Sequence, residues 1–88
     1  MDELTKLCRN TAMITRVIDG EAVIMDPQNG KVMALNEVGS LIWELLDGTH
    51  NKKAILDEII REFDVDREQA AVDLEDFLVV LRSKDLLA

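Results

Sequence analysis

The chain has 88 residues, of which 48% are hydrophobic and 32% are charged, a balance that fits one globular domain rather than a disordered segment. Its net charge is −8, with 18 acidic against 10 basic residues. Nucleic acids and anionic membranes are bound through many Lys and Arg contacts, so this charge disfavours both as partners.

The N-terminal segment, residues 1–9, is predicted to be a flexible tail that precedes a single folded domain over residues 10–88. It begins MDELTKLCR and lacks the apolar stretch of a secretory signal. No run of about 18 apolar residues is present, so we expect no membrane span. Cys8 is the only cysteine and cannot form an internal disulfide, which favours a reducing cytoplasm as the compartment.

Two turn signals predict a three-stranded antiparallel meander with strands near residues 12–18, 21–26 and 31–36. Asp19-Gly20 lies between two apolar runs rich in β-branched residues and is a preferred sequence for a two-residue type I′ hairpin. Pro27 and Asn29-Gly30 separate the second run from the third. In a meander of this order, the first and third strands each keep an unpaired edge.

Helices are predicted from Asn36 onward, where the apolar period changes from two to nearly four. Asn36 is a favourable N-cap for the first helix, and Gly48 is placed to end it. Asn51 can cap a second helix near residues 52–63.

A third helix is predicted near residues 66–82, with Asp66 as its N-cap and Gln69 as the partner in a capping box. Strands followed by helices predict an α+β fold in which the helices pack on one face of the small sheet. The short turn between the last two helices gives this fold a winged-helix-like shape.

The sequence contains no recognisable catalytic motif. His50 is expected in an exposed turn and has no second His or Cys at metal-ligand spacing. The run Asp73, Glu75 and Asp76 is more typical of a solvated helix face than of paired acid catalysis. We therefore predict a protein that is not an enzyme and that has no catalytic residue, metal site or cofactor.

Two features suit the capture of a peptide. The third predicted strand, KVMALN, is an edge strand in which only Lys31 carries charge to block pairing. On the third helix, Asp73, Asp76, Phe77 and Val80 share one flank beside the main apolar stripe. An open edge beside a partly apolar helix favours addition of a peptide as a further strand. Isolated surface valines are also ordinary, so this alternative stays open.

The stretch LNEVGSLIWELLDG, followed later by DLEDFLVVL, resembles the PqqD-like family of RiPP recognition elements, which are peptide chaperones for ribosomally made and modified peptides. The similarity covers residues 13–87. It is most specific at Leu35-Asn36, Ile42-Trp43, Leu46-Asp47-Gly48, Asp73, Phe77-Leu78 and Leu81.

The resemblance implies that the leader segment of a precursor peptide pairs with the third strand and lies in a groove beside the third helix. The chaperone then presents the precursor to a modifying enzyme, often a radical SAM maturase. Carried over by position, the binding surface comprises Lys31, Val32, Met33, Ala34 and Leu35, faced by Asp73, Asp76, Phe77 and Val80.

Family members that serve pyrroloquinoline quinone usually have a PEG turn and a cysteine before the Asp-Gly. Here the turn reads Pro27-Gln28-Asn29-Gly30, and Leu46 stands before Asp47-Gly48. The resemblance therefore implies the broader peptide-chaperone role rather than that pathway.

Two alternatives to peptide capture follow from the predicted shape. One is a winged-helix domain that binds DNA or serves in regulation, although its candidate recognition helix carries five acids against two arginines. The other is a homodimer in which the free strand edge pairs with a second copy.

Overall fold

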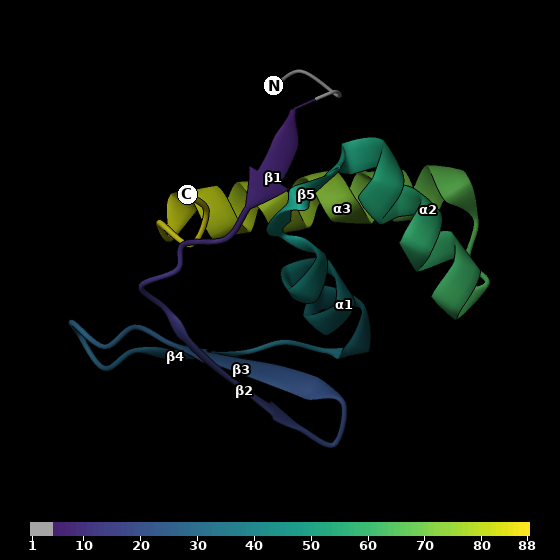
Figure 1. Ribbon diagram of the computed structural model, residues 1–88. Coiled ribbons are helices and arrows are strands. Elements are labelled where there is room, and N and C mark those ends of the chain that lie inside the picture. Colours follow the sequence, from purple (N-terminus) through teal and green to yellow (C-terminus); the bar gives the residue numbers. More distant parts are fainter. Residues whose placement is uncertain (1–4) are drawn as a thin grey trace.

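The computed structural model describes residues 5–88, which form three helices and two antiparallel sheets (Figure 1). The strands are β1 (Lys6–Cys8), β2 (Ile14–Ile18), β3 (Glu21–Met25), β4 (Val32–Ala34) and β5 (Asp47–Asn51), and the helices are α1 (Glu37–Leu45), α2 (Lys52–Phe63) and α3 (Arg67–Ser83). One sheet has the order β2-β3-β4 and the other pairs β1 with β5. The predicted α+β class, with a meander before the helices, is confirmed.

The meander follows the predicted turns. Asp19 and Gly20 both have positive φ, 52° and 80°, as a type I′ hairpin requires. β2 pairs with β3 from Ile14↔Met25 to Ile18↔Glu21, and β3 pairs with β4 over three residues. The strands are shorter than predicted, because regular pairing covers only residues 14–18, 21–25 and 32–34.

One face of the meander is covered by helices, with α1 lying beside it (Figure 1). Ala22 and Ile24 of β3 are each only 2% exposed, and Met33 of β4, which pairs with Ile24, packs against the same core. The indole N–H of Trp43 in α1 donates a hydrogen bond of 2.8 Å to the Thr15 hydroxyl of β2. The alternation of side chains along the strands therefore selects the face that meets the helices.

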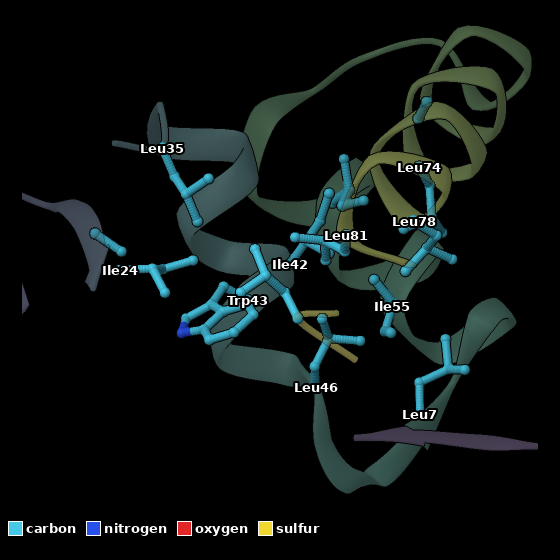
Figure 2. Packing of buried hydrophobic residues seen from close by; sticks show 14 residues of the cluster. Leu7, Ile24, Leu35, Ile42, Trp43, Leu46, Ile55, Leu74, Leu78 and Leu81 are labelled. Atoms are coloured by element: carbon cyan, nitrogen blue, oxygen red, sulfur yellow. The ribbon is translucent and has the colours of Figure 1, made fainter. Parts of the chain in front are cut away.

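A single apolar cluster joins the sheet to all three helices (Figure 2). Ile24 and Leu35 enter from the meander side, Ile42 and Trp43 from α1, and Leu78 from α3. These side chains are 5% exposed or less. Burial of each large apolar side chain contributes about 1.5–3 kcal/mol, so this cluster supplies most of the free energy that holds the layers together.

The N-caps agree with the sequence for two helices and differ for the third. Asn36 accepts a hydrogen bond from the Gly39 N–H and Asn51 accepts one from the Ala54 N–H. The Asp66 side chain makes no cap hydrogen bond. Gln69 instead donates to Asp73 one turn further along, so the predicted capping box does not form.

The segment predicted as a tail differs from the structure at its described end. Residues 6–8 form β1, and Leu7 is 5% exposed within the core. Arg9 donates from its backbone N–H to the Leu46 carbonyl, and the Ala88 N–H donates to the Cys8 carbonyl. Pairing between residues 39 to 45 positions apart leaves no local signal, which is why the sequence did not indicate it. Residues 1–4 of the predicted tail lie outside the described residues.

The first helix ends earlier than predicted. α1 stops at Leu45, and Gly48, which was expected to end the helix, lies in β5 with φ +84°. His50 is likewise in β5, opposite Leu7 of β1, and not in a turn. The chain needs only a short link between α1 and α2, and pairing with β1 converts that link into a strand.

Candidate functional site

The outer edge of β4 has no strand partner among residues 5–88. The Lys31 carbonyl and the Leu35 N–H bond inward to β3, at Asp26 and Ala22. Backbone groups of alternate residues in a strand point to the same side, so those of Met33 also face β3. The N–H and C=O groups of Val32 and Ala34 then point outward, where an added strand would pair with them.

A groove of 470 Å³ opens between β4 and the C-terminal end of α3. Its walls come from β3 and β4, from the turn between them and from the end of the helix. The lining residues are Ile24, Asp26, Asn29, Lys31, Val32, Met33, Ser83, Lys84 and Leu86. An open strand edge and a groove with both apolar and polar walls therefore lie side by side.

α3 runs antiparallel to β4 along this groove. At the Leu35 end, a Cβ placed on Gly39 would lie 3.5 Å from both Leu35 Cβ and Phe77 Cε1, so Phe77 lies near the end of β4. At the Lys31 end, Ser83, Lys84 and Leu86 line the groove. The tightest contact of such a Cβ would be 3.3 Å from Asn36 Oδ1, the N-cap acceptor, which favours a glycine inside α1 although glycine costs about 1 kcal/mol there relative to alanine.

One flank of α3 is turned toward β4 and the other toward α2. At 100° per residue, Phe77 and Lys84 share a flank with Asp73, Asp76 and Val80. The opposite flank contains Glu75, which forms an ion pair with Lys52 of α2. Of the predicted helix residues, Phe77 is placed near the end of β4, and Asp73, Asp76 and Val80 lie within about 100° of it around the helix.

The predicted site residues fall into three groups. Lys31, Val32 and Met33 line the groove. Leu35 and Phe77 both lie close to Gly39 outside the groove lining, with Leu35 buried and Phe77 half-buried. Ala34, Asp73, Asp76 and Val80 are exposed and are not among the residues that line the groove. Contact of these nine residues with a peptide stays a prediction.

Sequence reasoning missed the end of α3 as a wall of the groove. Ser83, Lys84 and Leu86 line it, and Leu86 is 6% exposed. The backbone N–H of Leu86 donates to the Leu81 carbonyl, which folds the chain back after the helix. The spacing of seven residues between Phe77 and Lys84 was the available signal, since it places both on one helix flank.

A second hollow, of 810 Å³, lies between the β2–β3 hairpin and the helices α1 and α2. Its floor includes Trp43, and three glutamates, Glu37, Glu44 and Glu62, contribute to its lining. Arg9 lies there too, but its guanidinium donates to the carbonyls of Trp43, Glu44 and Leu46. Val17 of β2, which is 68% exposed, also lines this hollow, and the outer edge of β2 has no strand partner among residues 5–88.

The described residues offer no grouping typical of a metal site, since no three of their His, Cys, Asp or Glu side chains could hold an ion together. His50 Nδ1 lies 3.0 Å from Asp47 Oδ1. Hydrogen bonds from the Thr49 hydroxyl and backbone N–H, followed by that from His50, hold the pKa of Asp47 well below its usual value. This is a local turn network in β5, distant in sequence from the groove.

No described helix is long and apolar enough to cross a bilayer.

A family model described as coenzyme PQQ synthesis protein D (PqqD) matches residues 21–87, which include β3, β4, all three helices and the residues that line the groove. The chain belongs to the PqqD family. A search of curated proteins finds no significant match. The predicted family resemblance is thereby confirmed.

Two solved structures are similar to this PqqD-family chain over nearly its whole length. One is described as TbiB1 in complex with the TbiA(beta) leader peptide; it has 39% sequence identity and a TM-score of 0.82, and the match covers 91% of this chain and 93% of that one. The other is a lasso peptide synthetase B1 complexed with the leader peptide, with 19% identity, a TM-score of 0.82 and coverage of 94% and 98%. At that identity, the second supports the PqqD-like fold alone.

Proposed function

We propose that this chain is a non-catalytic chaperone that binds the leader segment of a ribosomally made precursor peptide as an added strand on β4. The observation that carries the proposal is the open edge of Val32 and Ala34 beside the groove at the end of α3. It is supported by the PqqD family match and by the relative of 39% identity, which is described in complex with a leader peptide.

Strand addition would satisfy the outward backbone groups of Val32 and Ala34. Each such hydrogen bond contributes a net of about 0.5–1.5 kcal/mol. Side chains of an added strand alternate, so every second peptide residue would point into the groove toward Met33, Val80 and Leu86. The backbone bonds would then supply affinity without regard to sequence, and the groove would supply register and selectivity.

The partner enzyme is the second part of the proposal. The described residues contain no metal cluster and no buried polar side chain that could serve chemistry, so modification of the bound precursor is assigned to another protein. A radical SAM maturase fits the expectation drawn from the family. The chaperone would hold the leader and leave the remainder of the precursor extended and accessible to that enzyme.

The binding mode can be tested with the TbiA(beta) leader peptide as the probe and ¹⁵N-labelled full-length chain. On titration, the amide signals of residues 31–36 and of the α3 flank with Phe77 should shift, whereas those of β1 and β5 should not. A scrambled peptide of the same composition should cause no shifts at equal concentration. Shifts confined to the β2 edge, or an absence of shifts up to millimolar peptide, would contradict the proposal.

A matched pair of proline variants isolates the role of the strand edge. Val32→Pro removes an outward N–H from β4 without touching its bonds to β3. Val17→Pro does the same on β2, because the closing pair Ile18↔Glu21 of a two-residue hairpin bonds inward and leaves Val17 facing out. Val32→Pro should weaken peptide binding about tenfold, and Val17→Pro should leave it unchanged. Equal losses in both variants would indicate a general effect on the sheet.

A homodimer through the free edge is tested in the same samples. Light scattering should report a monomer whose mass does not change with the Val32→Pro substitution. A dimer that dissociates on that substitution and loses peptide binding would assign the edge to a second copy of the chain. DNA binding gains no support, because five of the residues on and beside α3, Asp66, Glu68, Asp73, Glu75 and Asp76, are exposed acids.

A further inference from the structure

The surface beside β4 differs in charge between the groove and the Leu35 end of the strand. At the end where β4 begins, Lys31 and Lys84 both line the groove, one from the strand and one from the end of α3. Both are exposed, and neither ammonium group takes part in an ion pair within residues 5–88. Asp26 also lines this end, and its Oδ1 accepts a hydrogen bond from the Gln28 N–H in the turn. The net charge of this end is therefore positive.

Beyond the groove, toward the Leu35 end of β4, the exposed side of α3 is acidic. Asp73 and Asp76 lie on the α3 flank that faces β4, within one turn of Phe77, which lies near Leu35. Both carboxylates are exposed, and neither forms an ion pair among the described residues. Asp73 only accepts a neutral hydrogen bond from Gln69. Its negative charge therefore remains available to a ligand.

The separation of the two ends matches a short stretch of extended peptide. Lys31 and Leu35 are four residues apart, which corresponds to about 13 Å along a strand at about 3.3 Å per residue. Along α3, Asp76 and Lys84 are eight residues apart, which corresponds to about 12 Å at about 1.5 Å per residue. The distance between the basic and the acidic residues is therefore about the same along the strand as along the helix.

Strand alternation determines which peptide residues meet these charges. Lys31, Met33 and Leu35 have side chains on the same face of β4, with Met33 packed against the core and Leu35 buried in it. A strand added beside them places residues i, i+2 and i+4 on that face. The first would lie near the two lysines, the second beside Met33 and Val80, and the third near the two aspartates.

We propose that the groove selects leader segments in which an acidic residue, an apolar residue and a basic residue stand at alternate positions, with the acidic side chain at the Lys31–Lys84 end. This inference rests on the proposed function, since it specifies the peptide class for the same site. Opposite charges steer and orient a peptide, while a like charge at either end is disfavoured. Charge would therefore decide the direction in which the peptide lies on the edge.

The experiment selects binders from a phage-displayed library of random twelve-residue peptides on the full chain. It uses the wild type, a variant with both ends reversed (Lys31→Glu, Lys84→Glu, Asp73→Lys and Asp76→Lys) and a control (Lys6→Glu and Lys53→Glu). The reversed variant has the net charge of the wild type, and the control changes charge away from the groove. Synthetic copies of selected peptides are then titrated into labelled protein to locate where they bind.

The expected result is that wild type and control select the same pattern of opposite charges four residues apart. A wild-type peptide should bind the reversed variant about tenfold more weakly, and a copy with its two charges exchanged should regain affinity for that variant. The inference is overturned if selected peptides shift residues 31–36 yet carry no charge order, or if reversal leaves their affinity unchanged; the proposed function would still stand. If selected peptides shift other parts of the chain, or if none binds, both fail together.

Discussion

The indole N–H of Trp43 donates to the Thr15 hydroxyl at 2.8 Å, which joins α1 to the first strand of the meander. Trp43 is 2% exposed, so most of its ring lies in the core while its one polar atom meets a strand side chain. A buried indole usually has such a partner. This bond fixes the helix against the same sheet whose opposite edge strand, β4, borders the groove.

Replacing Thr15 with valine should lower the free energy of unfolding by about 1 kcal/mol, because the indole N–H loses its acceptor while the side-chain volume is kept. Urea unfolding followed by the fluorescence of Trp43 measures the change. Thr11→Val is the matched control, since Thr11 is exposed and its side chain makes no hydrogen bond in the described structure. An equal loss in both variants would show that the hydroxyl of Thr15 has no special role.

Substitution of Asn51 by alanine should destabilise the chain by about 1 kcal/mol, because its side chain accepts the Ala54 N–H at the start of α2. Asp66→Ala should cost clearly less, since Asp66 makes no cap hydrogen bond and contributes only its charge to the dipole of α3. The two variants can be compared by urea denaturation at neutral pH. A larger loss for Asp66→Ala would contradict the assignment of the caps.

Leu7→Ala should cost about 2–4 kcal/mol, because it leaves a cavity where β1 closes the core. Lys6→Ala on the same strand replaces an exposed side chain and should change stability by less than about 0.5 kcal/mol. Thermal unfolding of both variants checks this contrast. If Leu7→Ala were as stable as Lys6→Ala, β1 would be dispensable and the N-terminal segment would behave as the predicted tail.

Acid should weaken the fold partly through Asp47. The pKa of this carboxyl is lowered in the folded chain by hydrogen bonds from Thr49 and His50, whereas an unfolded aspartate has a pKa of about 3.9. Its stabilisation is therefore present above the unfolded pKa and is lost as the pH falls toward the folded pKa. Between about pH 6 and pH 3, Asp47→Asn should lose less stability than the wild type in urea titrations.

Glu21→Gln provides the comparison for this pH dependence, since Glu21 is exposed and makes no side-chain hydrogen bond in the described structure. Its free energy of unfolding should fall with decreasing pH almost as steeply as that of the wild type, and more steeply than that of Asp47→Asn. If the free energy of unfolding of Asp47→Asn fell with pH as steeply as that of the wild type, the turn network in β5 would not favour the ionised carboxylate of Asp47.

The elements that the sequence determined by itself are those governed by near neighbours. Asp19-Gly20 specified the hairpin because both residues tolerate positive φ, and Asn36 and Asn51 specified helix starts through their own side chains. The motifs around Leu35-Asn36 and Trp43 indicated the family. The open edge after Lys31 followed from the order of the strands, because a meander always leaves its last strand half paired.

Tertiary structure alone decided the features that depend on contacts between distant segments. β1 and β5 are strands only because each supplies the other's hydrogen-bond partners, and neither carries a local β pattern. The predicted capping box at Asp66 does not form, because the Gln69 side chain donates to Asp73 along α3 instead. The groove itself requires Lys84 and Leu86 to lie beside β4, which depends on the turn closed by the Leu86 N–H on the Leu81 carbonyl and on the packing of α3 in the core, and the free energy of that packing is not encoded in any single stretch of the chain.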